Sequence, residues 1–213
     1  ARTQLRGDVA ADGTAFTIDL ADASRAGIAL AAQAALDGEV LRATRAQLRT
    51  PGGQLSFKGS VGLQAPYQVD VAGDFSELDP AAAYRLQALL GLAAATDEPV
   101  WLPRLQGRLS GNWAASGCAW PQPQLTTRLG SVRGTLDGQS LRLDWRGDVS
   151  LQRIDRVDLD LSHGDVALAA SGSFGQAGDR LQFRARAGDL ARFDARLGGA
   201  VTASGQLLGG WAD

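Results

Sequence analysis

Three kinds of side chain in this sequence have the right type for chemistry: one histidine, a run of aspartates and one cysteine. His163 is expected in a turn; it has no second histidine with which to form a metal site, and no partner set for a catalytic triad. Asp155, Asp158 and Asp160 could supply paired carboxylates, but they are interleaved with apolar residues, which indicates the solvated face of a strand. Cys118 is the only cysteine, so it forms no internal disulfide, and its Gly/Pro-rich surroundings predict an exposed connection.

Other common functional sites also lack their residues. The glycine clusters do not open a helix after a strand, as a phosphate-binding loop requires. The formal net charge is −2, with 21 basic and 23 acidic residues, which gives no electrostatic basis for binding nucleic acid. We therefore expect no enzyme activity, cofactor, metal or nucleic-acid partner. The tryptophans are expected to pack in strands or at their rims: Trp101, Trp113, Trp120, Trp145 and Trp211.

The elements that position these residues follow a period of two. Leu141, Leu143 and Trp145 alternate with Arg142 and Asp144, and residues 16–20, 67–71, 157–161 and 181–186 follow the same rule. Such alternation gives a strand one apolar and one polar face. Turn signals separate these runs, at Asp12-Gly13, Asp37-Gly38, Pro51-Gly52-Gly53, Asp137-Gly138, Gly164-Asp165 and residues 175–179. The pattern predicts an all-β antiparallel meander, with strands of about five to ten residues.

The sequence also repeats itself. Residues 48–62 (LRTPGGQLSFKGSVG) align without a gap with residues 161–175 (LSHGDVALAASGSFG). GDFSELD at 73–79 then matches GDLARFD at 188–194, and GRLSGNW at 107–113 matches GQLLGGW at 205–211. Three landmarks in the same order predict a repeat of roughly a hundred residues. We expect a first module over residues 1–115 and a second over 116–213, within one continuous elongated fold.

One segment departs from the strand pattern. Asp79 and Pro80 are suited to begin a helix, and Leu86, Leu89 and Leu90 lie on one apolar stripe of residues 80–95. This insertion is either a helix that packs over a gap in the core or one that lies across or lines a binding groove.

A one-sided meander must cover its apolar face. We expect the sheet to curl into an open trough, because a sandwich or a closed barrel does not account for the repeat. Many inner residues are alanines, too small to fill the interior, which favours a ligand cavity. The predicted groove-lining residues are Phe57, Val69, Val71, Leu141, Leu143, Trp145, Val157, Leu159, Val166, Leu168, Leu181 and Phe183.

The succession GDLARFD and then GQLLGGW, after strands such as LSHGDVALAASGSFG, resembles the TamB family, the inner-membrane component of the translocation and assembly module and a relative of AsmA-like proteins. The resemblance covers essentially the whole chain, as two modules from the middle of a longer protein. The lack of methionine and the start in mid-pattern also predict a segment of a longer chain.

The resemblance implies a fold and a function. The fold is a β-taco with an apolar interior, as in bridge-like lipid-transfer proteins. The implied location is the periplasm of a Gram-negative bacterium, in a protein with an inner-membrane anchor and an outer-membrane barrel partner, TamA, of the Omp85 type. The implied roles are phospholipid transport to the outer membrane and assembly of autotransporters and other outer-membrane proteins. The anchor and the TamA contact are expected outside this segment.

Two alternatives remain open. A structural β-solenoid or adhesin stalk would have a packed core, and a chaperone would hold unfolded outer-membrane strands along its edges. Interior volume separates the stalk from a conduit, whereas sequence does not separate the conduit from the chaperone.

Overall fold

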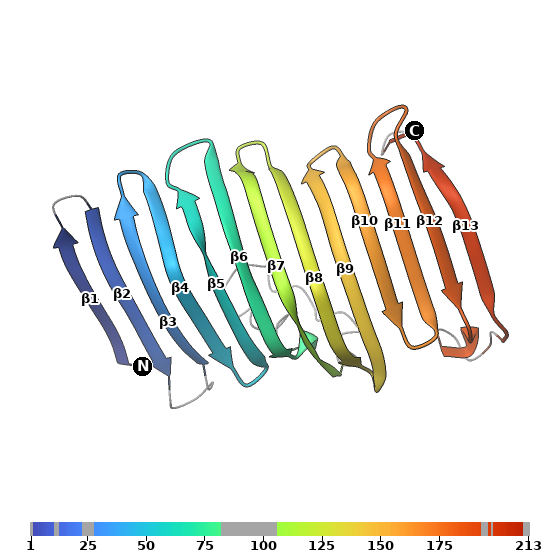
Figure 1. The fold of residues 1–213 in the computed structure, drawn as a ribbon, viewed down its shortest axis with the longest axis horizontal. Coiled ribbons are helices and arrows are strands. Elements are labelled where there is room, and N and C mark those ends of the chain that lie inside the picture. Colours follow the sequence, from blue (N-terminus) through green and yellow to red (C-terminus); the bar gives the residue numbers. More distant parts are fainter. Residues whose placement is uncertain are drawn as a thin grey trace.

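The computed structural model describes residues 2–10, 13–22, 28–81, 106–192, 196 and 198–210. These residues form one antiparallel sheet of thirteen strands, in which the strand order is the sequence order. Figure 1 shows the strands side by side across the long axis, with the two chain ends at opposite ends of the sheet. The strands are β1 Arg2–Ala10, β2 Gly13–Asp22, β3 Ile28–Asp37, β4 Val40–Thr50, β5 Gly53–Gly62, β6 Tyr67–Leu78, β7 Gly107–Trp120, β8 Gln124–Leu136, β9 Gln139–Ser150, β10 Ile154–His163, β11 Val166–Phe174, β12 Arg180–Ala187 and β13 Val201–Leu208.

The predicted all-β meander is confirmed. Eight of its thirteen strands have the expected length, whereas β4 and β6 to β9 are longer, with 11 to 14 residues. The sequence underestimates this length because bulges interrupt the alternation while pairing continues. One shift lies between Leu129 and Val132 of β8, where Ser131 has a φ of 52°. Its backbone N–H donates to Asp144 Oδ1 at 2.7 Å, and this hydrogen bond lowers the pKa of Asp144.

The predicted turns join the strands where the structure describes them. Asp137 and Gly138 connect β8 to β9 with φ values of 49° and 73°, which is the left-handed geometry that an Asp-Gly hairpin turn favours. Asp37-Gly38, Pro51-Gly52, Gly164-Asp165 and residues 175–179 connect the neighbouring pairs of strands. Asp12 lies outside the described residues.

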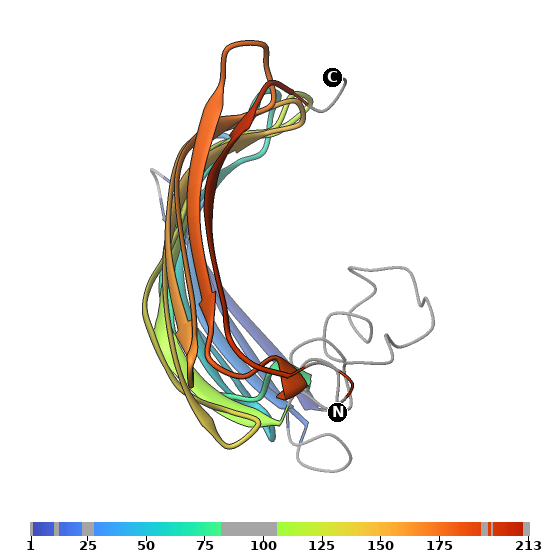
Figure 2. The same cartoon turned by 90° about the vertical axis from the view of Figure 1, so that its right-hand side faces the viewer.

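The sheet is curved. Figure 2 shows the strands bending along their length, so that the sheet forms an arc that is open on one side. Bulges and glycine kinks are the usual sources of such curvature. Gly59 in β5 has a φ of 149°, and a Cβ at this position would lie 2.1 Å from the Asp70 carbonyl oxygen. Gly172 in β11 has a φ of 126°, and a Cβ there would lie 2.1 Å from the Arg180 carbonyl oxygen.

Gly59 and Gly172 are equivalent positions of the first repeat landmark, so the two copies of this landmark share the same backbone kink. Leu48 pairs with Leu55 across the β4–β5 hairpin. Their counterparts Leu161 and Leu168 pair in the same way across β10–β11.

The second landmark does not occupy equivalent positions. Gly73 lies inside β6, whereas Gly188 follows the end of β12. The same Gly-Asp sequence therefore lies in a strand in the first copy and in the connection after a strand in the second copy. The predicted module boundary between residues 115 and 116 falls inside β7, and the sheet continues through it.

The predicted helix at 80–95 lies almost entirely outside the described residues. Its start is described: residues 80 and 81 are helical, and the Ala81 backbone N–H donates to Asp79 Oδ1 at 3.0 Å. This is the bond expected of an aspartate that caps a helix. The orientation of Leu86, Leu89 and Leu90 stays a prediction. Among the described residues, no helix has the length and apolar character needed to cross a membrane.

Candidate functional site

The candidate site is the apolar face of the sheet, which the pairing register aligns from strand to strand. Residues directly opposite each other on neighbouring strands point to the same face. One row of such partners, here called the central row, crosses β3 to β13. It consists of Ala32, Ala46, Phe57, Gly73, Trp113, Leu129, Trp145, Leu159, Ala170, Phe183 and Gly205.

Large and small residues alternate in parts of the central row. Gly73 separates Phe57 from Trp113, and their rings meet with centroids 6.5 Å apart and planes at 47°. A Cβ on Gly73 would lie 2.0 Å from the Ser56 carbonyl oxygen and 3.0 Å from Phe57 Cβ. The missing side chain therefore lets two aromatic rings from non-adjacent strands approach each other.

The two tryptophans of the row differ in their hydrogen bonds. Trp145 donates its indole N–H to Thr127 Oγ1 at 3.0 Å, and Thr127 donates to the Gly147 carbonyl oxygen at 3.1 Å. The indole N–H of Trp113 is buried and has no hydrogen-bond partner among the residues that the structure describes. An unpaired buried donor is unfavourable by about 1–3 kcal/mol, so this position is polar but unsatisfied within an apolar surface.

All twelve predicted groove residues lie on the apolar face. Phe57, Trp145, Leu159 and Phe183 belong to the central row, and the others lie beside it on the same strands. Val157 is buried and the other eleven are half-buried. Whether lipid occupies this face stays a prediction.

Sequence reasoning missed several members of this face. Trp113 and Leu129 are absent from the predicted set although they are direct neighbours in the central row. Trp113 lies among alanines, glycines and serines, and Leu129 lies next to the β8 bulge, so neither shows a clean alternation. The sequence signal that could have placed Trp113 on this face is the set of glycines that β7 shares with the other groove strands.

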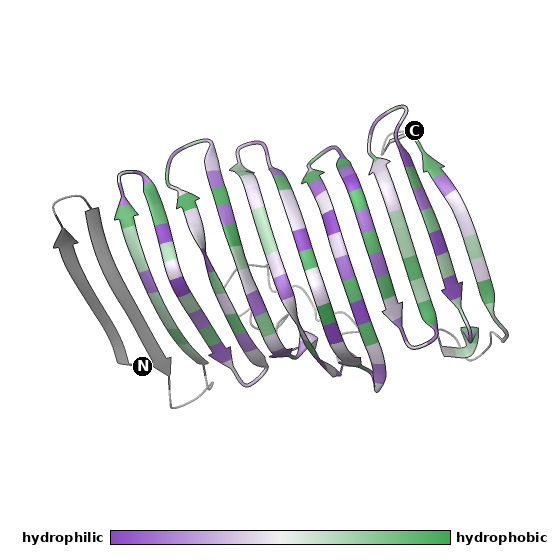
Figure 3. Ribbon diagram, in the orientation of Figure 1, coloured by the Kyte–Doolittle hydropathy of each residue, from purple (hydrophilic) through white to green (hydrophobic). Residues whose placement is uncertain are grey.

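Side chains on the polar face are more exposed to solvent than their neighbours on the apolar face of the same strand. On β12, Leu181, Phe183 and Ala185 are half-buried, whereas Gln182 and Arg184 are exposed. Figure 3 shows the same alternation of apolar and polar residues along most strands. The apolar side chains therefore shield one another from solvent along the row.

The residues considered for catalysis are placed as follows. Asp158 and Asp160 are exposed on the polar face, as expected, and no group of residues suited to hold a metal occurs in the part of the chain described. His163 is the last residue of β10, not a turn residue, and its Nε2 lies 2.8 Å from the Leu136 carbonyl oxygen. Cys118 was expected in an exposed connection, but it is half-buried within β7 because that strand extends to Trp120.

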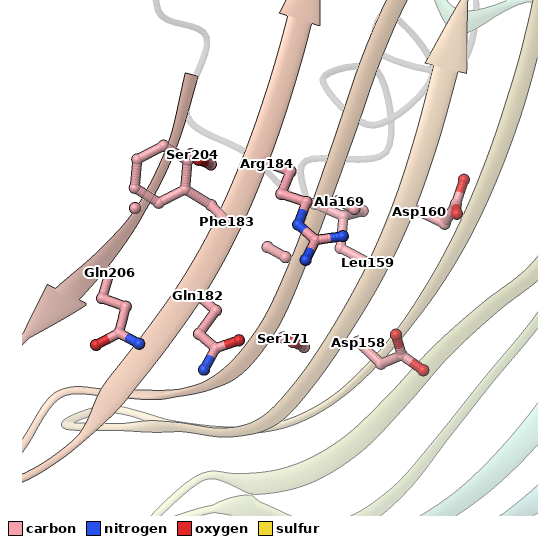
Figure 4. Close-up of a pocket in the computed structure, with 12 residues that line it drawn as sticks. Asp158, Leu159, Asp160, Ala169, Ser171, Gln182, Phe183, Arg184, Ser204 and Gln206 are labelled. Atoms are coloured by element: carbon pink, nitrogen blue, oxygen red, sulfur yellow. The ribbon is translucent and has the colours of Figure 1, made fainter. Parts of the chain in front are cut away.

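The polar face carries a shallow depression over β10 to β13. Figure 4 shows the polar side chains that line it, and its volume is about 560 Å³. Its polar lining residues are Asp158, Asp160, Ser171, Gln182, Arg184, Ser204 and Gln206. Ala169 and four residues of the central row, Leu159, Ala170, Phe183 and Gly205, complete the lining.

A buried ion pair ties the turns at one end of β9 to β12. Asp179 accepts hydrogen bonds from Arg153 Nε at 3.0 Å and Nη2 at 2.7 Å. Ser173 Oγ donates to the same carboxylate at 2.9 Å, and the Gln176 backbone N–H donates at 3.0 Å. The bonds from Arg153, followed by those from Ser173 and Gln176, hold the pKa of Asp179 below its ordinary value of 3.8. This cluster joins the β9–β10 loop to the β11–β12 loop.

Neither a family model nor a curated protein nor a solved structure matches this chain.

Proposed function

We propose that this chain binds phospholipid acyl chains along its apolar face and forms one segment of a lipid conduit between two membranes. The observation that carries the proposal is the uninterrupted apolar face, whose central row runs from β3 to β13. In this proposal the apolar face is the inner wall of the arc. The mutual shielding of its side chains supports this, because side chains converge on the inside of a curve.

The small number of buried residues argues against a filled core. Within the described part of the chain, the fully buried apolar residues are Ala46, Phe75, Ala81, Val132, Val157 and Ala187. A stalk with stacked layers of side chains needs its large apolar residues buried. Here Phe57, Leu143 and Leu168 are only half-buried, so a ligand or another chain segment has apolar surface to cover.

The energetics suit a lipid. Burial of an alkyl chain is worth about 0.8 kcal/mol per CH2, so moving a lipid with two long chains through water costs on the order of 20 kcal/mol. A continuous apolar trough removes most of that barrier, while the head groups stay in water at the open side. Thirteen strands at a spacing of about 4.8 Å span roughly 58 Å, which is part of a bridge between membranes. The proposal includes the periplasmic location and the TamA-type partner that the family resemblance implies.

Site-specific photo-crosslinking tests this proposal. A photo-reactive residue at Leu143 or Leu168, on the apolar face, should capture phospholipid in cells. The same photo-reactive residue on the polar face should not capture phospholipid. The control positions are Arg142, on β9 next to Leu143, and Asp158 and Asp160, on β10 between β9 and β11. Equal capture on both faces would show that the apolar face has no special affinity and would overturn the proposal.

A further inference from the structure

A second depression lies on the polar face, over β4 to β8, with a volume of about 490 Å³. Its lining differs from that of the depression in Figure 4, because cations predominate among its charged residues; Ala46, Phe57, Gly73 and Trp113 of the central row also line it. Arg45, Lys58 and Arg128 supply three positive charges, and Asp74 supplies the only negative one. The lining therefore has a formal charge of +2, whereas Asp158, Asp160 and Arg184 give the other depression −1.

The pairing register builds this cationic depression from one row of the polar face. Lys58 on β5 pairs with Ala72 on β6. Ala72 pairs with Ala114 on β7, which pairs with Arg128 on β8. Two long cationic side chains thus stand at the ends of a floor made of two alanines. The short floor leaves room for a group between the cations.

A bulge adds the third cation. Ala43 pairs with Gly59 and Ala46 with Phe57, so both Thr44 and Arg45 stand opposite the single residue Lys58. The Thr44 hydroxyl donates to the Gln33 carbonyl oxygen at 3.3 Å on the other neighbouring strand. Arg45 lines the same depression as Lys58. Bulges re-aim side chains in this way and are common beside binding sites.

Placing Arg45 opposite Lys58 has an energetic cost, because like charges that face each other across strands repel. Some other arginines have acidic partners: Arg142 lies 3.5 Å from Asp144 on the polar face, and Arg42 lies 3.7 Å from Asp37. Across the described residues, Arg45, Lys58 and Arg128 form no such ion pair, so a bound anion would relieve the repulsion.

We propose that this depression binds a doubly charged phosphate group, as in a phosphate monoester. Such a group carries a charge of about −1.5 to −2 near neutral pH, which matches the excess charge of the lining. Arginine and lysine are the side chains that bind phosphate most strongly, through charge-assisted hydrogen bonds. Asn112 and Gln47, also in the lining, offer further amide donors. By register, Lys58 and Arg128 lie on the opposite face from the acyl-chain side chains, so a phosphate titration tests this proposal separately from lipid capture on the apolar face.

The group could belong to a free phosphate compound or to the head group of a membrane lipid, and two titrations distinguish these sources. The first follows the backbone amide signals of Lys58, Ala72 and Ala114 by NMR while inorganic phosphate is added at constant ionic strength. The second measures flotation with phosphatidylcholine vesicles that contain phosphatidic acid.

Each titration is repeated with Lys58→Gln and Arg128→Gln, which should weaken binding at least about tenfold because each removes a charge-assisted contact. Arg184→Gln is the matched control, since it removes an exposed arginine of the same face outside the site. Saturable phosphate binding with this variant pattern supports the proposal with a free source. The same pattern with vesicles alone supports a lipid head group. No saturable binding of either probe, or equal weakening by Arg184→Gln, would overturn the proposal.

Discussion

Replacing Leu168 by arginine is the sharpest test of whether the apolar face is an open surface or a packed core. Leu168 lies on β11, paired with Leu161 on one side and Ala185 on the other, and it is half-buried. The matched change is Ala169→Arg. Ala169 is the next residue on the same strand, is exposed on the polar face and lies between Asp160 and Arg184.

The expected loss of stability follows from this burial. Full burial of a leucine side chain is worth about 1.5–3 kcal/mol, so a half-buried one contributes roughly 1 kcal/mol. The stem of an arginine keeps part of the apolar contact while its guanidinium reaches water across an open face. We therefore expect Leu168→Arg to lower the melting temperature by about 2–4 °C, which is the usual effect of 1 kcal/mol in a chain of this size. In a packed core the same charge would be buried without a partner and would cost several kcal/mol.

The assay has two parts. Thermal unfolding followed by circular dichroism should show a small shift for Leu168→Arg and almost none for Ala169→Arg. Phospholipid capture by a photo-crosslinker at Leu143 should be lost in Leu168→Arg, because the charge interrupts the apolar path, and kept in Ala169→Arg. Unfolding of Leu168→Arg at all temperatures would refute the open-face reasoning, and so would full lipid capture by the folded variant.

Two further predictions concern the framework. Asp179→Asn should lower the urea midpoint at pH 7. The folded pKa of Asp179 is depressed, so this stabilisation is present above the unfolded value of 3.8 and is lost as pH falls through the folded pKa. The difference between the wild-type and variant midpoints should therefore shrink as the pH falls below 3.8, and a pH-independent difference would contradict the assignment. Gly172→Ala should lower the free energy of unfolding by about 1–3 kcal/mol because of its backbone conformation, and the close contact with the Arg180 carbonyl oxygen adds to this loss. A Cβ at Gly198 meets open space, so the control variant Gly198→Ala should unfold as wild type does. Equal urea midpoints for the two variants would show that the kink at Gly172 is not required.

Much of the fold could be predicted because alternation is a local property of the sequence. Successive side chains of a strand point to opposite faces, so every second residue lies on the same face. This places Leu141, Leu143 and Trp145 on one face of β9. The Asp137-Gly138 turn is equally local, since both residues favour the conformation that the hairpin needs.

The features that the sequence did not predict depend on neighbouring strands. Lys58 and Arg128 are seventy positions apart, and only the register of four strands places them at the ends of one alanine floor. The bulge that brings Arg45 opposite Lys58 has no signature in the order of residues. The repeat predicted at Gly73 and Gly188 also depends on neighbouring strands, because a short Gly-Asp sequence does not reveal whether its backbone pairs with another strand.

The sequence-ordered pairing of the strands makes folding a one-dimensional process. Each ladder between the thirteen strands joins a strand to the next one along the chain, and the isolated bridge between Gly175 and Gly210 is an exception. Most of these ladders are closed by a short turn, whereas residues 79–106 connect β6 to β7 and residues 188–200 connect β12 to β13. A hairpin that forms anywhere becomes a template for its neighbours, and the free energy accumulates ladder by ladder, as in repeat proteins. Cooperativity should then decay with distance along the sheet, and we expect the long strands β7 and β8 to exchange their amide hydrogens more slowly than the short strands β12 and β13.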